Sequence, residues 1–176
     1  GPPGVVCQTS SYTLSGATAQ YYTTFSWTNN GLGSLSGADP LHPVYTPDPD
    51  ETGPVTLTLT ASPLSQCLSV TDSFVLTVNP RATASAGSNE TICETGSFTL
   101  SEATASGFLS TVWTTTGDGT FTDDSQIITT YTPGTADIAA GFADLSLTAN
   151  AYATCADASD LLKLTINKQA IAVAGS

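Results

Sequence analysis

Four cysteines have the spacing that most clearly predicts chemistry in this sequence. Cys7 and Cys93 lie 86 positions apart, and Cys67 and Cys155 lie 88 positions apart. Each half of the chain thus contains one member of each equivalent pair. This arrangement predicts one disulfide per half, Cys7–Cys67 and Cys93–Cys155. Such bonds place the protein in an oxidising compartment. Cys7-Gln8 also suggests an internal thioester, but Cys93 is followed by Glu94, which favours disulfides for all four.

Histidine chemistry is confined to one half of the chain. His42 is the only histidine, and Ile128 stands at the matching position 86 residues later. A lone histidine between Leu41 and Pro43 in a loop is expected to have a surface role, because catalytic histidines act with partners. No catalytic residue is predicted, and the protein is not expected to be an enzyme.

Acidic side chains form two loop clusters. A glycosidase needs two carboxylates across a cleft, and nothing in the sequence indicates a cleft. Calcium is the other ligand to consider, because hard cations bind clustered oxygens on loops, but no complete calcium-loop motif is present. We expect these acids to solubilise the surface and predict no cofactor and no metal ligand. The clusters are Asp48, Asp50 and Glu51, and Asp118, Asp123 and Asp124.

Two adjacent tyrosines are the best candidates for binding a sugar by stacking. Tyr21 and Tyr22 align with Gly107 and Phe108, in a segment that is expected to be a loop. Packing at an edge or in the core is the simpler interpretation of both rings.

The net charge excludes two classes of partner. The chain has 15 acidic and 3 basic side chains, a formal charge of −12. Nucleic acid and anionic membranes attract Lys and Arg, so neither is an expected partner. The sequence has no apolar run of the length that spans a membrane, so membrane insertion is not expected either.

The elements that must position these residues repeat along the chain. From Cys7 to Trp27 the sequence matches Cys93 to Trp113 without a gap, and an insertion near 48–53 changes the offset from 86 to 88. The repeat predicts three segments: residues 3–80 form one copy, residues 81–169 a second, and residues 170–176 begin a third. The third is inferred because residues 172–176 resemble residues 84–88.

Each copy has strand periodicity. Apolar residues alternate with threonine over residues 55–61, and with serine and threonine over residues 145–149, as in half-buried antiparallel strands. About seven such strands per copy predict an all-β fold of two tandem immunoglobulin-like β-sandwiches. Four aromatic residues recur in register and are expected to be in the cores: Trp27, Trp113, Tyr45 and Tyr131.

The second copy carries motifs of a known family. Trp113 precedes Gly117-Asp118-Gly119, and Tyr131-Thr132-Pro133-Gly134 follows. These motifs resemble the PKD domain, an immunoglobulin-like sandwich. The first copy has Leu32 in place of Asp118, which argues for a turn role of the glycines. The cysteine pair and the Ala-x-Ala-Gly-Ser segment resemble PKD-like repeats of very long bacterial surface adhesins, of the type IX-secreted kind found in gliding bacteria.

This resemblance implies an extracellular, cell-surface location. The expected function is that of a non-catalytic spacer or stalk that projects a binding region of an adhesin away from the cell. The expected partners are neighbouring repeats of the same chain, with a glycan or a solid surface as further candidates. A carbohydrate- or surface-binding module is the alternative function.

Overall fold

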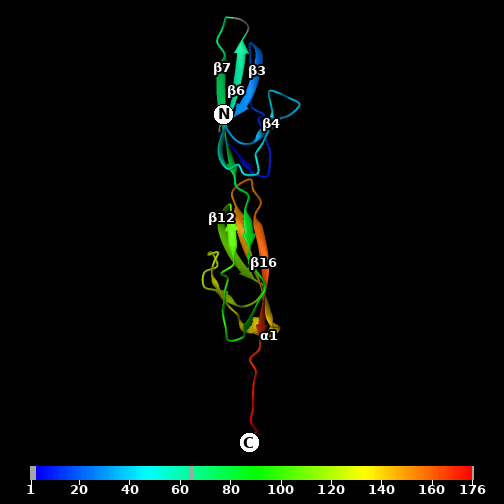
Figure 1. The fold of residues 1–176 in the computed structure, drawn as a ribbon, viewed down its shortest axis with the longest axis vertical. Coiled ribbons are helices and arrows are strands. Elements are labelled where there is room, and N and C mark those ends of the chain that lie inside the picture. Colours follow the sequence, from blue (N-terminus) through cyan, green and yellow to red (C-terminus); the bar gives the residue numbers. More distant parts are fainter. Residues whose placement is uncertain (1–2, 64–65, 176) are drawn as a thin grey trace. The chain divides into compact units, whose positions relative to one another are not determined.

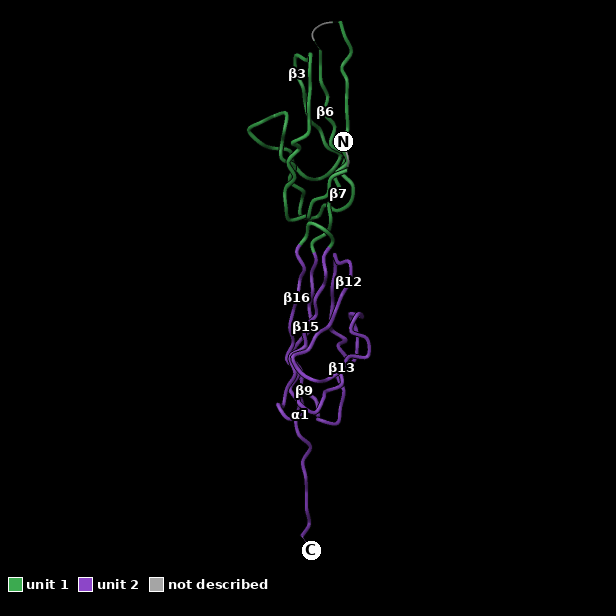
Figure 2. The backbone as a smooth tube through the Cα atoms, turned by 180° about the vertical axis from the view of Figure 1, so that it is seen from behind, with its two compact units in different colours: residues 1–81, 152–155 green, residues 82–151, 156–176 purple. Residues whose placement is uncertain are grey.

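The computed structural model describes residues 3–63 and 66–175, and it divides into two compact units. Unit 1 comprises Gly1–Arg81 and Tyr152–Cys155, and unit 2 comprises Ala82–Ala151 and Ala156–Ser176 (Figure 2). The short segment 152–155 therefore interrupts the chain of unit 2 and folds as part of unit 1.

Unit 1 contains a four-stranded and a three-stranded sheet (Figure 1). The strand orders are β1-β7-β6-β3 and β2-β5-β4. Strand β1 pairs with β7 in parallel, whereas β6 pairs with both β7 and β3 in antiparallel. The strands are β1 (Gly4–Cys7), β2 (Tyr12–Thr13), β3 (Tyr22–Asn29), β4 (Ser34–Ser36), β5 (Val44–Thr46), β6 (Gly53–Pro63) and β7 (Val70–Asn79).

Unit 2 contains the same two kinds of sheet and a third, two-stranded one. The orders are β12-β15-β16-β9, β10-β14-β13 and β11-β8. The strands are β8 (Thr83–Ser85), β9 (Glu90–Cys93), β10 (Phe98–Thr99), β11 (Thr104–Ser106), β12 (Phe108–Thr115), β13 (Thr120–Phe121), β14 (Thr130–Thr132), β15 (Phe142–Ala151) and β16 (Ala158–Asn167). The prediction of an all-β fold is confirmed.

Apolar alternation accounts for the long strands. In β6 the side chains of Val55, Leu57 and Leu59 are buried, and the threonines between them are half-buried on the other face. In β15, Leu145 and Leu147 are fully buried in the same way. Burying one face of each strand removes apolar side chains from water, which stabilises the fold by roughly 2 kcal/mol per large side chain. Each unit has its own core of such side chains.

Every strand of unit 1 has a counterpart in unit 2. Strands β1, β2, β3 and β5 begin 86 residues before β9, β10, β12 and β14, and β7 begins 88 residues before β16. The pairing agrees as well, because Leu57 faces Phe74 as Leu145 faces Leu162. Strands β8 and β11 have no counterpart strands among the described residues of unit 1.

The helix α1 (Thr135–Ala140) is a single short element between β14 and β15. Its first residue follows Gly134, which has no side chain to cap the free amides. The Asp118 carboxylate takes that role, because it accepts hydrogen bonds from the amides of Ala136 (3.0 Å) and Asp137 (3.2 Å). Hydrogen bonding from the Ala136 amide holds the pKa of Asp118 below its usual value. The described part of the chain contains no helix with the length and apolar character that crossing a bilayer requires.

The disulfide differs from the predicted pairs. Cys7 bonds to Cys155, while Cys67 and Cys93 are exposed free thiols in the described chain. The predicted pairs require each copy to close on itself, but a repeat also allows a cysteine to bond with the second cysteine of the next copy. Cys155 reaches Cys7 because segment 152–155 folds into unit 1, where the Asn79 side chain donates a hydrogen bond to the Ala153 carbonyl (2.8 Å).

Candidate functional site

An open groove lies on unit 1 beside strand β7. Its volume is about 350 Å³, and one wall is the segment 14–18 that follows β2. The other wall is formed by the β7 residues Asp72, Ser73 and Phe74, and Trp27 and Leu59 contribute the apolar part. A second hollow of about 180 Å³ continues it along residues 18–20 and the end of β6.

In unit 2 a strand occupies the matching place. Strand β8 pairs with β11 and contacts β15 and β16, which are the counterparts of β6 and β7. Ala82 and Ala86 at its two ends are buried, and the Ala86 amide donates a hydrogen bond to the Asp160 carboxylate (2.8 Å). Asp160 corresponds to Asp72 in the groove wall. The groove of unit 1 is thus the site that β8 fills in unit 2.

Side chains around the groove are correspondingly more exposed than their counterparts. Trp27 is half-buried, whereas Trp113 is 2% exposed. Ala61 and Phe74 are also half-buried, whereas Ala149 and Leu162 are fully buried. Trp27 was predicted to be a core residue, and it packs against the core of unit 1 with one part of its ring open to the groove.

The two indoles are held in the same way. Trp27 Nε1 donates a hydrogen bond to the Leu41 carbonyl (3.2 Å), and Trp113 Nε1 donates to the Ile127 carbonyl (3.1 Å). Leu41 and Ile127 lie at matching positions. The orientation of Trp27 therefore does not depend on what fills the groove.

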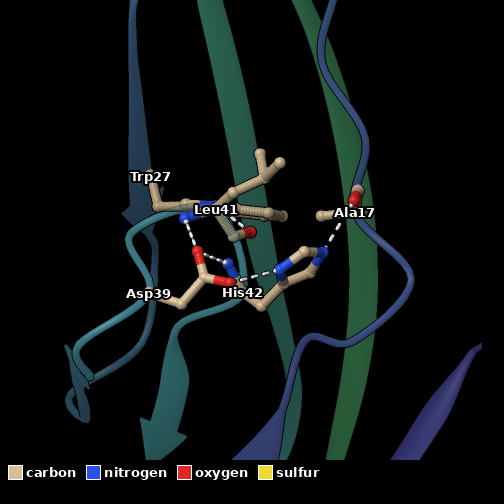
Figure 3. Close-up of polar contacts among 5 residues, drawn as sticks. All are labelled: Ala17, Trp27, Asp39, Leu41 and His42. Atoms are coloured by element: carbon tan, nitrogen blue, oxygen red, sulfur yellow. Dashed lines mark hydrogen bonds and ion pairs between the residues drawn. The ribbon is translucent and has the colours of Figure 1, made fainter.

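His42 lies beside the groove and is bonded through both ring nitrogens (Figure 3). Its Nδ1 is 2.7 Å from the Asp39 carboxylate, and its Nε2 is 3.0 Å from the Ala17 carbonyl in the groove wall. Both partners are acceptors, so this geometry fits an imidazolium that donates two hydrogen bonds. The hydrogen bond to Asp39 raises the pKa of His42, and a protonated ring has no free lone pair with which to act as a base.

Replacing Asp39 with Asn is expected to lower the pKa of His42 toward the ordinary value of about 6.5. The folded-state pKa is raised, so the stabilisation by this pair is present below that ordinary value and is lost as the pH rises through the folded pKa. Proton NMR of the ring reports a single titration, because the chain has one histidine. Asp50→Asn is the matched control, and an unchanged midpoint in Asp39→Asn would contradict the assignment.

A buried tyrosine–carboxylate pair supports the turns in each unit. The Tyr45 hydroxyl donates to Glu51 (2.6 Å), and the Tyr131 hydroxyl donates to Asp137 (2.6 Å). Both tyrosines are fully buried, and the two acids are at most 5% exposed. Burial raises the pKa of Tyr131 to about 12 and also raises the pKa of Tyr45.

These carboxylates also bind the glycine turns. Glu51 accepts a hydrogen bond from the Leu32 amide (2.6 Å), and Asp137 accepts from the Gly119 amide (3.0 Å). A β-carbon at Gly31 would collide with Glu51, and one at Gly117 would collide with Asp137. Glycine is therefore required at these positions because a buried carboxylate approaches the backbone too closely for a side chain to fit.

Sequence reasoning missed this pair of acids. Glu51 was expected on the surface with Asp48 and Asp50, but it is buried, and Asp137 was not singled out at all. The signal was present, because each acid follows its tyrosine by six positions at an offset of 86. The insertion was placed too early to preserve that match.

Two further acids of the predicted clusters bond to residues two positions along the chain. Asp48 accepts from the Asp50 amide, and Asp123 accepts from the amide and hydroxyl of Ser125. Within residues 3–63 and 66–175, no three His, Cys, Asp or Glu side chains gather as metal ligands do.

The two neighbouring tyrosines differ. Tyr22 packs edge-on against Phe25, with ring centroids 5.2 Å apart. Tyr21 is 91% exposed and has a left-handed backbone with φ of 57°. Gly107, its counterpart, adopts φ of 63° without the steric cost that a side chain adds.

Comparison with known proteins rests on structure alone. No family model matches the chain, and no curated protein matches its sequence. The D00-D0 domain of intimin superposes with a TM-score of 0.52 at 12% identity, covering 93% of this chain and 96% of that one. Drosophila N-cadherin EC1-4 superposes with a TM-score of 0.52 at 11% identity, covering 96% of this chain and 47% of that one. The N-terminal four Ig domains of Dscam1 isoform 6.9 superpose with a TM-score of 0.50 at 13% identity, covering 94% of this chain and 43% of that one.

The fold is immunoglobulin-like. At these identities the likeness establishes the fold and not the role.

Proposed function

We propose that this chain is a non-catalytic spacer of an extracellular surface protein, built from two tandem immunoglobulin-like, PKD-like sandwiches and the start of a third. The parent would be a long adhesin, and its proposed export by a type IX system in a gliding bacterium follows the sequence resemblance. The spacer would separate a binding region from the cell.

The observation that carries this proposal is the Cys7–Cys155 bond. It joins the first strand of unit 1 to the loop that leaves β15 of unit 2 and returns to β16. Residues 152–155 belong to unit 1, so the bond fixes to unit 1 a loop whose two ends lead into β15 and β16. A disulfide also supports an oxidising, extracellular location. A segment that transmits load between a cell and a distant tip gains from such a bond.

The chemistry of the described side chains supports a role without catalysis. The one histidine is bonded through both nitrogens to acceptors. The buried acids are bonded to tyrosine hydroxyls and backbone amides. None of these groups is positioned as a free base or nucleophile beside the groove.

A sugar-binding module is the second candidate, favoured by Tyr21. An exposed aromatic ring in a left-handed conformation costs roughly 1 kcal/mol that its glycine counterpart avoids. Such strain is retained where the side chain has a use, and stacking on a sugar ring is the use that an exposed tyrosine fits.

Thermal unfolding with and without ligands distinguishes the two functions. A spacer is expected to show a Tm shift below about 1 °C with millimolar glycans or calcium, because only a ligand of the native state stabilises it. Tyr21→Gly is expected to raise stability by about 1 kcal/mol through relief of strain. A shift of several degrees that Tyr21→Gly removes would contradict the spacer and establish the sugar-binding module, with Tyr22→Gly as the matched control.

A further inference from the structure

We infer that the edge of strand β3 in unit 1 is a docking site for the same strand of a second copy of this chain. The two β3 strands would pair in antiparallel about a twofold axis at Ser26, and the two four-stranded sheets would become one continuous sheet. This association is independent of the proposed spacer role.

The main chain of β3 has groups that face away from the rest of its sheet. Strand β3 is the last strand of the sheet and has only β6 beside it. The Asn30 amide donates a hydrogen bond to the Thr56 carbonyl of β6 (3.2 Å). Alternate residues of an antiparallel strand bond to the same neighbour, so the amides and carbonyls of Phe25 and Trp27 face away from β6. Within residues 3–63 and 66–175, no backbone carbonyl accepts a hydrogen bond from these two amides. Such an edge is a template for another strand.

In unit 2 the equivalent edge, that of β12, is covered. The Trp113 amide donates a hydrogen bond to the Asp124 carbonyl (2.7 Å), and the Thr111 hydroxyl donates to the Ser125 carbonyl (2.7 Å). Asp123 and Asp124 also bring two acidic side chains to this covering segment. Covering segments and charged side chains are two means by which proteins prevent edge strands from pairing, so β12 is protected in both ways.

Unit 1 lacks both protections. Phe25 stands at the position of Thr111, and it has no hydroxyl that could hold a covering segment. Gly37 and Ala38 stand at the positions of the two aspartates, so the acidic charge is missing as well. The positions that would cover the edge follow β3 in the chain, so the exposure of β3 arises from residue types within unit 1.

The segment 37–41 is held in another way. The Asp39 carboxylate accepts hydrogen bonds from the amides of Leu41 (3.0 Å) and His42 (3.4 Å), which turn the segment on itself (Figure 3). Its hydrogen bond to β3 is made through the Trp27 indole, which donates to the Leu41 carbonyl. The main chain of Trp27 therefore stays available to a partner strand.

The distribution of charge favours a second copy as the partner. The chain has a formal charge of −12, so two copies repel each other over most of their surface. Residues 1–38 contain no Asp, Glu, Lys or Arg, and β3 lies among them. On the outer face of β3 the exposed side chains include Thr24, Ser26 and Thr28, and hydroxyl side chains pair favourably across antiparallel strands. Two acidic chains can therefore meet at this edge without bringing like charges together.

Twofold pairing of β3 satisfies the outward main-chain groups. With Ser26 opposite Ser26 of the second copy, Phe25 of each copy lies opposite Trp27 of the other, and each such pair exchanges two hydrogen bonds. Thr24 of each copy then lies opposite Thr28 of the other. The twofold axis uses each edge once, so the assembly closes as a dimer. Because the paired stretch is short, the dimer is expected to be weak and to form at high protein concentration.

Sedimentation velocity of the full chain from micromolar to millimolar concentration tests the docking. Wild-type chains are expected to associate as the concentration rises. Ser26→Lys is expected to weaken association about tenfold, because it places two lysines directly opposite each other at the axis. Thr60→Lys is the matched control: Thr60 lies beside Ser26 on β6, so the variant adds the same charge without facing the partner strand. A monomer at every concentration, or equal weakening by the two lysines, would overturn the proposal.

A charge-swapped pair of variants tests the twofold geometry. Ser26→Glu alone is expected to associate as poorly as Ser26→Lys, since it also places like charges opposite each other. An equimolar mixture of the two is expected to form a heterodimer at least as readily as the wild type, because the axis then brings a lysine opposite a glutamate. Both variants remain strongly acidic, so a general attraction between opposite net charges cannot produce this result. A mixture that stays monomeric would rule out pairing at Ser26.

Discussion

When the oxidised chain is pulled by its two ends until it is fully stretched, its length is expected to reach only about 100 Å, against about 600 Å after reduction. The reason is covalent. With Cys7 bonded to Cys155, force passes along residues 1–7, through the sulfur atoms and along residues 155–176. Residues 8–154 lie off that path and are not stretched. Single-molecule force spectroscopy with handles at both ends measures the difference directly.

The same measurement separates the observed bond from the predicted ones. Bonds at Cys7–Cys67 and Cys93–Cys155 would leave about 56 residues on the path and give a fully stretched length of about 190 Å. Cys67→Ser and Cys93→Ser are matched controls, because both positions are free thiols and their loss should leave the short extension unchanged. Cys155→Ser should extend like the reduced chain. A fully stretched length near 190 Å in the wild type would refute the Cys7–Cys155 bond.

A short covalent path has a physical consequence for a spacer. Under load, the strands that reach the force path are β1 and β16, while the other strands of both units are held inside the closed loop. Most of the fold is then protected from stretching even when those two strands are pulled free. Mechanical resistance of this kind depends on the bond and not on the depth of either core.

The long strands could be predicted from the sequence because their residues carry the signal locally. Apolar residues that alternate with Thr over residues 55–61 fix one buried face, and β6 has that face in the structure. The disulfide could not be predicted in this way. Equal spacing of the cysteines is compatible with a bond inside a copy and with a bond between successive copies, and the sequence does not show that residues 152–155 belong to unit 1.

The groove of unit 1 could not be predicted from the sequence for a similar reason. Trp27 and Trp113 are identical in type and in hydrogen bonding, and the pattern predicts equal burial for both. Their difference arises from β8, a three-residue strand of small side chains that contributes little to periodicity. Such a short strand can be recognised only from the sheet strands that it packs against, here β15 and β16, and these contacts are visible only in the folded structure.

Asp137→Ala is expected to destabilise unit 2 by about 4 kcal/mol. The Asp137 carboxylate accepts hydrogen bonds from the Tyr131 hydroxyl and from the amides of Gly119, Gly134 and Asp118, at 2.6 to 3.3 Å. It is 2% exposed, so water cannot replace these bonds without opening the turn. Removing an acceptor that satisfies several buried donors costs far more than a single surface bond.

Matched variants assign that cost to its parts. Tyr131→Phe removes one donor and is expected to cost about 1 to 2 kcal/mol, and Asp123→Ala removes an exposed acid and should cost well under 1 kcal/mol. Urea unfolding followed by Trp113 fluorescence in a Trp27→Phe background reports unit 2 alone. A loss below 1 kcal/mol in Asp137→Ala would refute the structural role of the carboxylate.

Glu51 provides the parallel test in unit 1. It accepts from the Tyr45 hydroxyl and the Leu32 amide, fewer donors than Asp137 has, so Glu51→Ala is expected to cost less, about 2 to 3 kcal/mol. Glu51→Asp retains the charge but shortens the reach to the turn by one methylene, and it should recover only part of the loss. The order of these losses follows from the number of backbone amides that each carboxylate holds. On this account the tyrosine, the acid and the glycine turn act as one unit of structure in both halves of the chain.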